Sequence, residues 1–395
     1  MNNVNIGFLG FGVVNSGVYD ILTKNKQRIL KSTNKNIIPK KALIRDIYKK
    51  RNSTNMIFSS NPLDIVDDPT IHIVIEAMGG IEFPRRCILK ALNNKKHVIT
   101  VNKAVVSKHL DEFLKVAKEN NVLFLFEGSV AGGTKIIKPL IEECRFDSIT
   151  EIKGILNGTT NYILSKMYNE NISYDDCLKE AQKLGFAEAD PTDDVKGIDV
   201  KRKINILSSI SKGVFIDEDL IDARGIDDIN LLDIKAFKKL NLIPKLIGYF
   251  RDLEVLNIGV SPMLVDNSHV FSNINNSFNI VSLKGDTKDS LFSSLGAGSL
   301  PTGSAILNDL MDILNEKNFD IDIEKNELDI NSKLDGDYYL RLKKNREISK
   351  DYKYEVIDDS DDNYNCYRIF DTNNEYLKNF CLEDEFYCHI LKGAV

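Results

Sequence analysis

The sequence Val4-Asn5-Ile6-Gly7-Phe8-Leu9-Gly10-Phe11-Gly12, at residues 4–12, decides the fold of the first part of the chain. Its apolar residues predict a buried strand, its glycines predict a tight turn, and helical periodicity follows from 13 to about 30. Gly10 permits the turn, and Gly12 lets the backbone approach a pyrophosphate at the helix N-terminus. Asn15 stands where a third glycine is expected, so we expect a looser contact between strand and helix. This signal alone leaves open a glycine turn of some other α/β protein.

Strand and helix patterns alternate up to about residue 145. Apolar runs at 41–45, 71–77, 98–101 and 122–126 predict further strands, and helices are predicted at 83–92 and 109–119. The continuous apolar run at 71–77 is typical of a parallel sheet that is covered on both faces. We therefore predict an α/β fold with a Rossmann-type doubly wound parallel sheet, the dinucleotide-binding domain, over 1–145.

The pattern changes after residue 146. A strand is predicted at 149–156, helices dominate from 160 to 240, and alternating apolar segments return near 242–260 and 278–283. This order predicts an α+β substrate domain over 146–317, with 300–317 rejoining the Rossmann part as an alternative. The tail at 318–395 is rich in acidic residues and contains short strand-like segments, which predict a small β-rich C-terminal appendage. The acidic run 358–362 is interpreted as a solvated turn.

Composition excludes several classes of protein. The chain has 395 residues and a net charge of -6, which gives no electrostatic basis for a nucleic-acid partner. No apolar run approaches the roughly 20 residues that span a bilayer, and no signal-peptide pattern opens the chain, so we expect a soluble, cytoplasmic protein without a membrane partner. The six cysteines are scattered and no CxxC or HExxH motif occurs, so we expect free thiols and no transition-metal site.

The end of the second strand bears on the choice of cofactor. An acidic residue at this place usually holds the ribose hydroxyls of NAD, whereas an arginine accommodates the 2′-phosphate of NADP. The chain has both, as Arg45 and Asp46, and the choice stays open. Arg45, with basic residues at 49–51 nearby, favours NADP, although these basic residues are equally typical of a solvated loop.

The segment 185–203 carries five carboxylates and leads into a basic helix. Asp199 and Lys203 are four residues apart, so they share one face of a helix. From the spacing alone, an ordinary ion pair on a capped amphipathic helix explains the pattern. The chemical alternative is that a lysine with a lowered pKa gives a proton to the alkoxide formed by hydride reduction of a carbonyl. Carboxylates such as Glu188 would then surround the ammonium group of an amino-acid substrate.

Two further segments follow strands of the predicted parallel sheet. Lys103 comes directly after the strand 98–101, at the edge where such folds bind ligands, although a plain surface lysine is an equal alternative. The segment 127–134, rich in turn residues, follows the strand 122–126.

Together these segments resemble the homoserine dehydrogenase family. The matching motifs occur in the family's order over about 1–315: GFGVV at 10–14, VNKA at 101–104, EGSVAGGT at 127–134, GILNGTTNYIL at 154–164, GFAEADPTDDVKGIDVKRK at 185–203 and LPTGSA at 300–305. The resemblance implies a reversible reduction of L-aspartate 4-semialdehyde to L-homoserine with NADPH or NADH, in threonine, methionine and isoleucine biosynthesis. It also implies a homodimer that forms through the second domain.

The resemblance further implies roles for single residues. Lys203 is the implied proton donor beside Asp199, and Lys103 polarises the carbonyl or positions water and cofactor. Cofactor binding is assigned to Gly10, Phe11, Gly12, Val13, Val14, Arg45, Thr100, Lys103 and Gly303. Substrate binding is assigned to Gly158, Thr159, Glu188, Asp194, Asp199 and Lys203. A monovalent cation, usually sodium, is implied at the Glu127 carboxylate and the carbonyls of Val130, Gly132 and Thr134, in keeping with the oxygen ligands of hard cations.

Three departures from the family pattern leave alternatives open. Asn15 replaces the third glycine, Thr134 stands where an aliphatic residue is commoner, and the tail resembles a degenerate or shortened regulatory ACT domain, which puts threonine feedback in question. One alternative is another NAD(P)-dependent aldehyde or alcohol oxidoreductase on the same scaffold. A second is a nucleotide-sensing regulator without catalysis, against which the retention of Lys103, Asp199 and Lys203 argues.

Overall fold

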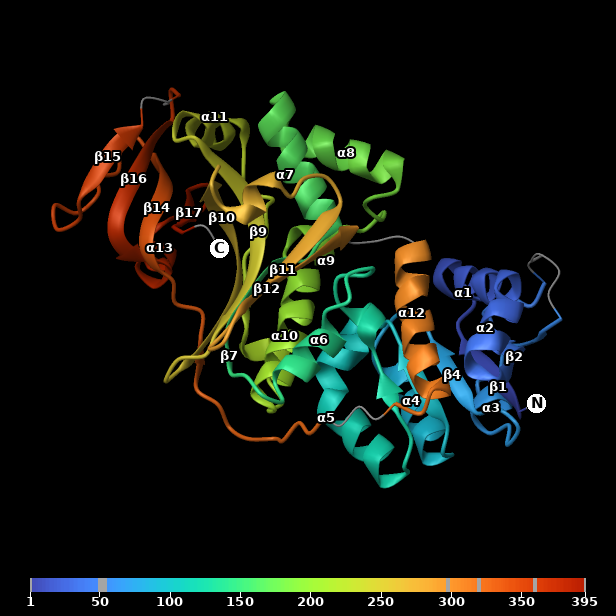
Figure 1. Cartoon of the computed structure of the whole chain (residues 1–395). Helices are drawn as coiled ribbons and strands as arrows, with labels where there is room; N and C mark the ends of the chain where they lie inside the picture. Colours follow the sequence, from blue (N-terminus) through green and yellow to red (C-terminus); the bar gives the residue numbers. More distant parts are fainter. Residues whose placement is uncertain (1, 49–54, 296–298, 318–320, 358–360, 394–395) are drawn as a thin grey trace. The chain divides into compact units, whose positions relative to one another are not determined.

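The computed structural model describes residues 2–48, 55–295, 299–317, 321–357 and 361–393 (Figure 1). The chain forms two compact units, and each unit gathers segments that are distant in sequence. The first comprises 1–146, 206–218 and 295–327, and the second comprises 147–205, 219–294 and 328–395. In the described part of the chain, no helix is long and apolar enough to cross a membrane.

The first unit is built on a six-stranded parallel sheet in the order β3-β2-β1-β4-β5-β6. Its strands are β1 (Asn2–Leu9), β2 (Lys35–Leu43), β3 (Ile57–Ser59), β4 (Ile73–Glu76), β5 (His97–Thr100) and β6 (Phe124–Leu125). The strand order reverses between β1 and β4, which confirms the predicted doubly wound sheet. In such sheets ligands bind in the crevice at the carboxyl ends of the strands on either side of this reversal.

Helices connect and cover these strands. They are α1 (Val13–Lys24), α2 (Lys26–Thr33), α3 (Leu63–Val66), α4 (Glu82–Asn93), α5 (Lys103–Glu119) and α6 (Ile137–Glu143), with α12 (Ser299–Leu314) returning late in the chain. α12 lies beside α1, and its Ile306 and Leu310 are fully buried in one core cluster with Val18 and Phe8 (Figure 1). Burial of this apolar stripe places α12 in the first unit.

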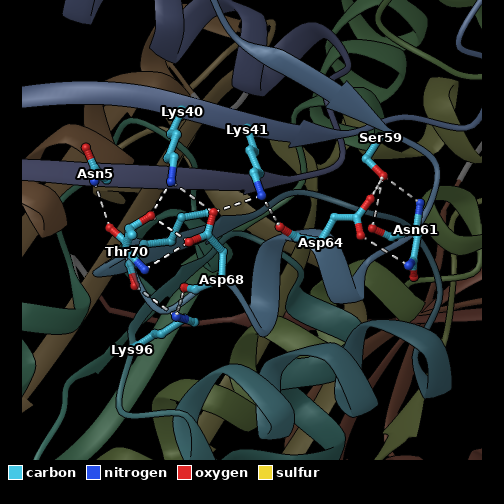
Figure 2. Close-up of polar contacts among 10 residues, drawn as sticks. Asn5, Lys40, Lys41, Ser59, Asn61, Asp64, Asp68, Thr70 and Lys96 are labelled. Atoms are coloured by element: carbon cyan, nitrogen blue, oxygen red, sulfur yellow. Dashed lines mark hydrogen bonds and ion pairs between the residues drawn. The ribbon is translucent and has the colours of Figure 1, made fainter.

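A polar cluster, which we call the Asp68 cluster, consists of Lys40, Lys41, Asp68 and Thr70 (Figure 2). β2 starts earlier than the sequence predicts, at Lys35, and a bulge skips Lys40 in the pairing with β1. The Nζ atoms of Lys40 and Lys41 both reach Asp68 Oδ2, at 3.0 and 2.8 Å. Consecutive side chains of a regular strand point to opposite faces, so the irregularity at Lys40 explains how both meet one carboxylate.

The second unit is built on an eleven-stranded mixed sheet. Its main path runs β12-β11-β7-β9-β10-β17-β14-β16-β15, and the short strands β13 and β8 also pair with β10. The strands are β7 (Ile149–Ile155), β8 (Asp222–Ala223), β9 (Leu242–Arg251), β10 (Leu256–Asp266), β11 (Phe278–Gly285), β12 (Asp289–Leu295), β13 (Ile330–Asn331), β14 (Asp335–Lys343), β15 (Tyr354–Ile357), β16 (Tyr364–Asn373) and β17 (Phe386–Leu391). The helices are α7 (Gly158–Glu170), α8 (Tyr174–Leu184), α9 (Thr192–Val195), α11 (Leu231–Lys239) and α13 (Asn374–Phe380), and α7 and α11 pack on β9. A further helix, α10 (Ile198–Lys212), begins in this unit, and its residues from 206 onward belong to the first unit.

The C-terminal strands have a recognisable topology. β17, β14, β16 and β15 are neighbours in that order, and every pair among them is antiparallel. This is the order of a ferredoxin-like β-α-β-β-α-β unit, with turns and loop at 344–353 where its first helix would lie. β17 also pairs in parallel with β10, so these strands continue the sheet of the second unit. A buried ion pair between Arg341 of β14 and Asp233 of α11 adds a second connection.

Candidate active site

The glycine turn after β1 has the conformation that close approach of a phosphate needs. Gly10 has φ +85°, and a Cβ there would lie 2.9 Å from the carbonyl oxygen of Ala77. Gly12 is the N-cap of α1, and a Cβ there would meet nothing within 4 Å. The first turn of α1 carries no acidic side chain and no side-chain cap. Its amides and dipole therefore suit an anion.

Asn15 forms a hydrogen bond within this turn. The side chain is fully buried, and its Nδ2 donates to the carbonyl oxygen of Gly10 at 2.6 Å. A glycine here would allow closer helix–strand packing, whereas the amide fills the space and satisfies a turn carbonyl.

A cavity of about 650 Å³ lies against the turn. It is lined by Gly10, Phe11, Gly12, Leu43, Ile44, Arg45, Asp46, Ser60, Ala77, Met78, Gly79 and Phe83. Arg45 and Asp46 both line it and both are exposed, so the geometry does not choose between NAD and NADP. Val13 is exposed and Val14 half-buried at the start of α1. The basic residues 49–51 that favoured NADP lie outside the described residues.

The carboxyl ends of β4 and β5 are joined by hydrogen bonds around a buried carboxylate. Glu76 is fully buried, accepts from the amide of Met78 at 2.6 Å and accepts from the hydroxyl of Thr100. Burial raises the pKa of Glu76 to about 7 although these hydrogen bonds oppose the shift. The hydroxyl of Thr100 also accepts from the amide of Asn102, the N-cap of α5. The network thereby fixes the turn that precedes Lys103, the half-buried first residue of α5.

Gly303 lies in α12, where a Cβ would meet Ile21 and Val18 at 3.6 and 3.7 Å. These are ordinary van der Waals distances, so the packing of α12 on α1, the helix that follows the cofactor turn, does not by itself require a glycine here. The side chain of Leu300, the first residue of the LPTGSA motif at 300–305, lies outside the described part of the structure.

A second constellation, which we call the Asp199 cluster, consists of Asn157, Asp194, Asp199 and Lys203 of the second unit. Asp199 is fully buried and Lys203 is nearly so, and the Nζ of Lys203 donates to Asp199 Oδ2 at 2.7 Å. The same Nζ donates to the carbonyl oxygen of Leu156 at 2.6 Å. Two acceptors on different elements therefore fix the ammonium group in place, which is what a proton donor needs.

Asn157 is the residue that sequence reasoning missed in this cluster. Its Nδ2 donates to Asp194 Oδ1 at 2.7 Å and to Asp199 Oδ2 at 2.9 Å. Its Oδ1 caps α7 by accepting from the amide of Thr160 at 2.8 Å. Asparagine before Gly158 and Thr159 is a recognisable N-cap signal in the sequence, although a cap alone does not predict the two carboxylate contacts.

The neighbouring substrate candidates differ in burial. Gly158 lies under the loop before β11, since a Cβ there would be 3.2 Å from the carbonyl oxygen of Ser277. Thr159 is buried and its hydroxyl donates to the carbonyl oxygen of Phe186 at 2.6 Å. Glu188 is exposed, and its backbone carbonyl accepts from the side chain of Gln182 at 3.1 Å. The structure thus brings Asp194, Asp199 and Lys203 into one network through Asn157, whereas Glu188 is an exposed residue of the loop.

The segment around Glu127 is held by backbone amides. Glu127 is buried, its Oε1 accepts from the amides of Ile136 and Ile137 at 2.7 and 2.9 Å, and its Oε2 accepts from the amide of Lys138 at 3.0 Å. Burial raises the pKa of Glu127 against these hydrogen bonds. Thr134 and Val130 are buried, and the turn between them carries positive φ at Ala131 and Gly132. Among the described residues, no group of three or more His, Cys, Asp or Glu is arranged to hold a metal ion.

The chain is similar to known proteins over most of its length. The family model "Homoserine dehydrogenase" matches residues 136–311, and "Homoserine dehydrogenase, NAD binding domain" matches 10–127. A homoserine dehydrogenase of Bacillus subtilis is 39% identical over 80% of this chain and 73% of the relative, and one of Synechocystis is 38% identical over 79% and 73%.

Solved structures resemble the fold as closely. The crystal structure of a homoserine dehydrogenase from Thiobacillus denitrificans has a TM-score of 0.88 and 30% identity, covering 99% of each chain. A homoserine dehydrogenase structure from S. aureus has a TM-score of 0.81 and 31% identity over 100% of both chains.

Proposed function

The chain belongs to the homoserine dehydrogenase family, and from that premise we propose how its residues carry out the reduction of L-aspartate 4-semialdehyde to L-homoserine. That reaction, a step of amino-acid biosynthesis, is the family's known function, and the chain is accordingly a nicotinamide-dependent oxidoreductase. The observation that carries the assignment of residues is the Asp199 cluster, in which one buried lysine is fixed by a buried carboxylate and a backbone carbonyl.

Lys203 is the proposed proton donor. The nicotinamide cofactor, when bound, supplies a hydride to the aldehyde carbon, and the carbonyl electron pair moves onto oxygen. A proton from the Lys203 ammonium then completes the hydroxyl group, and the neutral amine regains a proton from water. Asp199, hydrogen-bonded to Lys203 Nζ at 2.7 Å, stabilises the ammonium form and keeps it oriented.

Carboxylates and backbone groups of the second unit are proposed to hold the amino-acid end of the substrate. Asp194 is fixed by Asn157, and Glu188 is exposed on its loop, so both offer negative charge to an ammonium group. Gly158 and Thr159, at the N-terminus of α7, offer the positive end of a helix dipole to a carboxylate.

Residues of the first unit are proposed to hold the cofactor. Gly10, Phe11 and Gly12 line the cavity with the open helix N-terminus, which fits a pyrophosphate, and Val13 and Val14 continue it. Arg45 lines the same cavity and would pair with a 2′-phosphate, so NADP is the proposed preference over NAD. Thr100, Lys103 and Gly303 are assigned to the nicotinamide side, with Lys103 positioning cofactor or water and polarising the carbonyl.

Further features are proposed on the family resemblance with support from local geometry. A sodium ion at Glu127, Val130, Gly132 and Thr134 would add a cation to a buried carboxylate. Residues 1–145, rejoined by 300–317, are assigned to cofactor binding, the rest of 146–317 to substrate binding and homodimer formation, and 318–395 to a shortened ACT-like module, for which the ferredoxin-like strand order is the support. A cytoplasmic location completes the proposal.

The deciding experiment is oxidation of L-homoserine at high pH, with NAD and NADP compared side by side. We expect turnover with both and a lower KM for NADP. A lower KM for NAD would contradict the role given to Arg45. Absence of turnover with either cofactor would favour a nucleotide-sensing regulator, and turnover restricted to other alcohols would favour a different oxidoreductase.

A further inference from the structure

A second cavity, of about 290 Å³, lies in the second unit between the middle of its sheet and the C-terminal strands. It is lined by residues of β8 and β10 on one side and by α13 and the segment leading into β17 on the other, and it contains none of the residues assigned above to substrate or cofactor. Its walls carry two acidic and two basic side chains, Asp222, Glu385, Arg224 and Lys378.

The two acidic side chains of this cavity are already neutralised. Asp222 pairs with Lys378 at 3.3 Å and accepts from the hydroxyl of Ser332 at 3.0 Å. Glu385 pairs with Arg346 at 3.3 Å and accepts from two backbone amides, those of Lys343 and Leu382. Of the four charged side chains of the cavity, Arg224 is the one to which the described part of the chain offers no ion-pair partner.

Arg224 is a half-buried guanidinium that is fixed but not neutralised. Its Nη1 donates to the carbonyl oxygen of Tyr387 at 2.9 Å, and its Cζ lies over the Tyr387 ring, 3.8 Å from the ring centre. Among the residues that the structure describes, no carboxylate forms an ion pair with it. A guanidinium has five N–H donors, and a pre-oriented one in a partly enclosed cavity matches a carboxylate.

The backbone next to Arg224 is packed against the segment that carries the substrate carboxylates. The amide of Ile226 donates to the carbonyl oxygen of Val195 at 2.9 Å, and a Cβ at Gly225 would collide with that same oxygen. A Cβ at Gly197 would lie 3.2 Å from the carbonyl oxygen of Arg224. Val195 and Gly197 lie between Asp194 and Asp199. Because these backbone contacts are tightly packed, a movement of the backbone at Arg224 would also move the segment that carries the Asp199 cluster.

We propose that this cavity is a binding site for a small monocarboxylate, whose carboxylate pairs with Arg224 and whose short apolar body lies against Val260 and Leu382. Occupancy of the site changes the affinity of the enzyme for its amino-acid substrate through the contact of 224–226 with 195–197. The single uncompensated charge sets the ligand's net charge, and the cavity volume limits its size.

The binding test is titration of the full-length protein with potassium propionate, followed by calorimetry and thermal unfolding. Propionamide, which has the same shape without the charge, and potassium chloride are the ligand controls. We expect saturable binding of propionate, a Tm increase of about 3 °C at ten times its Kd, and no effect of propionamide. Glycine in a further arm tells whether an added ammonium group is accepted beside Asp222.

Variants separate this cavity from the substrate site, to which propionate could also bind. Arg224→Gln should raise the Kd of propionate roughly 10- to 100-fold, whereas Arg251→Gln, which removes a guanidinium paired with Glu151 in the same unit, should leave it unchanged. Ser261→Leu fills the cavity without removing the charge and should also abolish binding. Equal binding by wild type and by both cavity variants, or no binding by wild type, would overturn the site.

The coupling is tested with the active enzyme and therefore rests on the proposed function, whereas the binding test does not. Saturating propionate should change the KM for homoserine by about 5-fold or more in the wild type and leave it unchanged in Arg224→Gln. Binding at Arg224 with an unaltered KM would overturn the coupling and leave the site in place.

Discussion

The Asp68 cluster and the Asp199 cluster are built from the same pair of residue types, lysine and aspartate, in the two different units of the chain. In the first, two lysines share one carboxylate and keep 30% and 21% of their side chains exposed. In the second, one lysine with 10% of its side chain exposed meets a carboxylate that is fully buried. The access of water to the lysine and to the carboxylate distinguishes the clusters more clearly than residue identity does.

The electrostatic consequence differs accordingly. Burial of Asp68 opposes its ionisation, but hydrogen bonds from Lys41 and Thr70 outweigh that effect and hold its pKa below the usual range. Asp68 therefore stays ionised near neutral pH, where its carboxylate pairs with both lysines. The partners of Lys203 include one carboxylate, which also accepts from an amide, and one backbone carbonyl, and these two acceptors orient the ammonium group as a proton donor.

The largest expected difference between the clusters is in turnover. Lys203→Ala should lower kcat by about 10²–10⁴-fold, the usual size of a general-acid effect. Lys41→Ala, the matched lysine of the Asp68 cluster, should leave kcat unchanged. The first variant leaves the buried Asp199 without the Lys203 ammonium group and could therefore lower stability. Rates are for this reason expressed per folded molecule, and the folded fraction is measured by circular dichroism and by binding of the cofactor. Near-normal turnover of folded Lys203→Ala would remove Lys203 from the chemical step.

Asn157 tests whether the orientation of the Asp199 cluster matters. Asn157→Ala removes the amide that donates to Asp194 at 2.7 Å and to Asp199 at 2.9 Å, and kcat/KM should fall roughly 10- to 100-fold because the carboxylates are no longer held in place. Steady-state kinetics should show the loss in both kcat and KM. Asn157→Ser keeps the helix cap but not the bridge, so recovery of activity in that variant would show that the cap alone matters.

Mutation of the Asp68 cluster should change the free energy of unfolding and leave kcat unchanged. Asp68→Ala removes the shared partner of two lysines and should lower the free energy of unfolding by about 2 kcal/mol in urea titrations, with kcat unchanged. Asp67→Ala is the matched control, because the neighbouring Asp67 pairs with Lys90 at 3.3 Å and has 42% of its side chain exposed. Its effect should stay within about 0.5 kcal/mol. A loss of turnover in folded Asp68→Ala would contradict the purely structural role.

Much of this architecture could be predicted from local patterns. The alternation of strands and helices up to 145 fixed the doubly wound sheet, and the four-residue spacing of Asp199 and Lys203 fixed their shared face on α10. The beginning of β2 could not be predicted in this way. The residues from Lys35 to Lys41 are largely polar and include Pro39, and their pairing with β1 contains a bulge that depends on the neighbouring strand.

Long-range contacts account for the rest of what the sequence did not reveal. The pairing of β17 with β10 joins residues more than 100 positions apart, and no turn or period announces it. The contacts of Asn157 with Asp194 and Asp199 span 37 and 42 residues. The burial of Asn15 against the carbonyl of Gly10 likewise depends on how tightly α1 packs. The absence of the expected third glycine at position 15 does not predict that packing.

The smallest expected effect is on the pH dependence of stability. The folded-state pKa of Asp68 lies below the value of 3.8 that an unperturbed aspartate has, so its stabilising contribution is present above about pH 4 and is lost as the pH falls through the folded-state pKa. The difference in unfolding free energy between wild type and Asp68→Asn should therefore be constant from pH 7 to 5 and shrink by about 1 kcal/mol on further acidification, as followed by urea titration at each pH. Asp67→Asn, with an exposed partner, should show no such change. A difference that already shrinks between pH 7 and 5 would mean that Asp68 takes up a proton in that range. The two lysines would then not hold its pKa below the usual range.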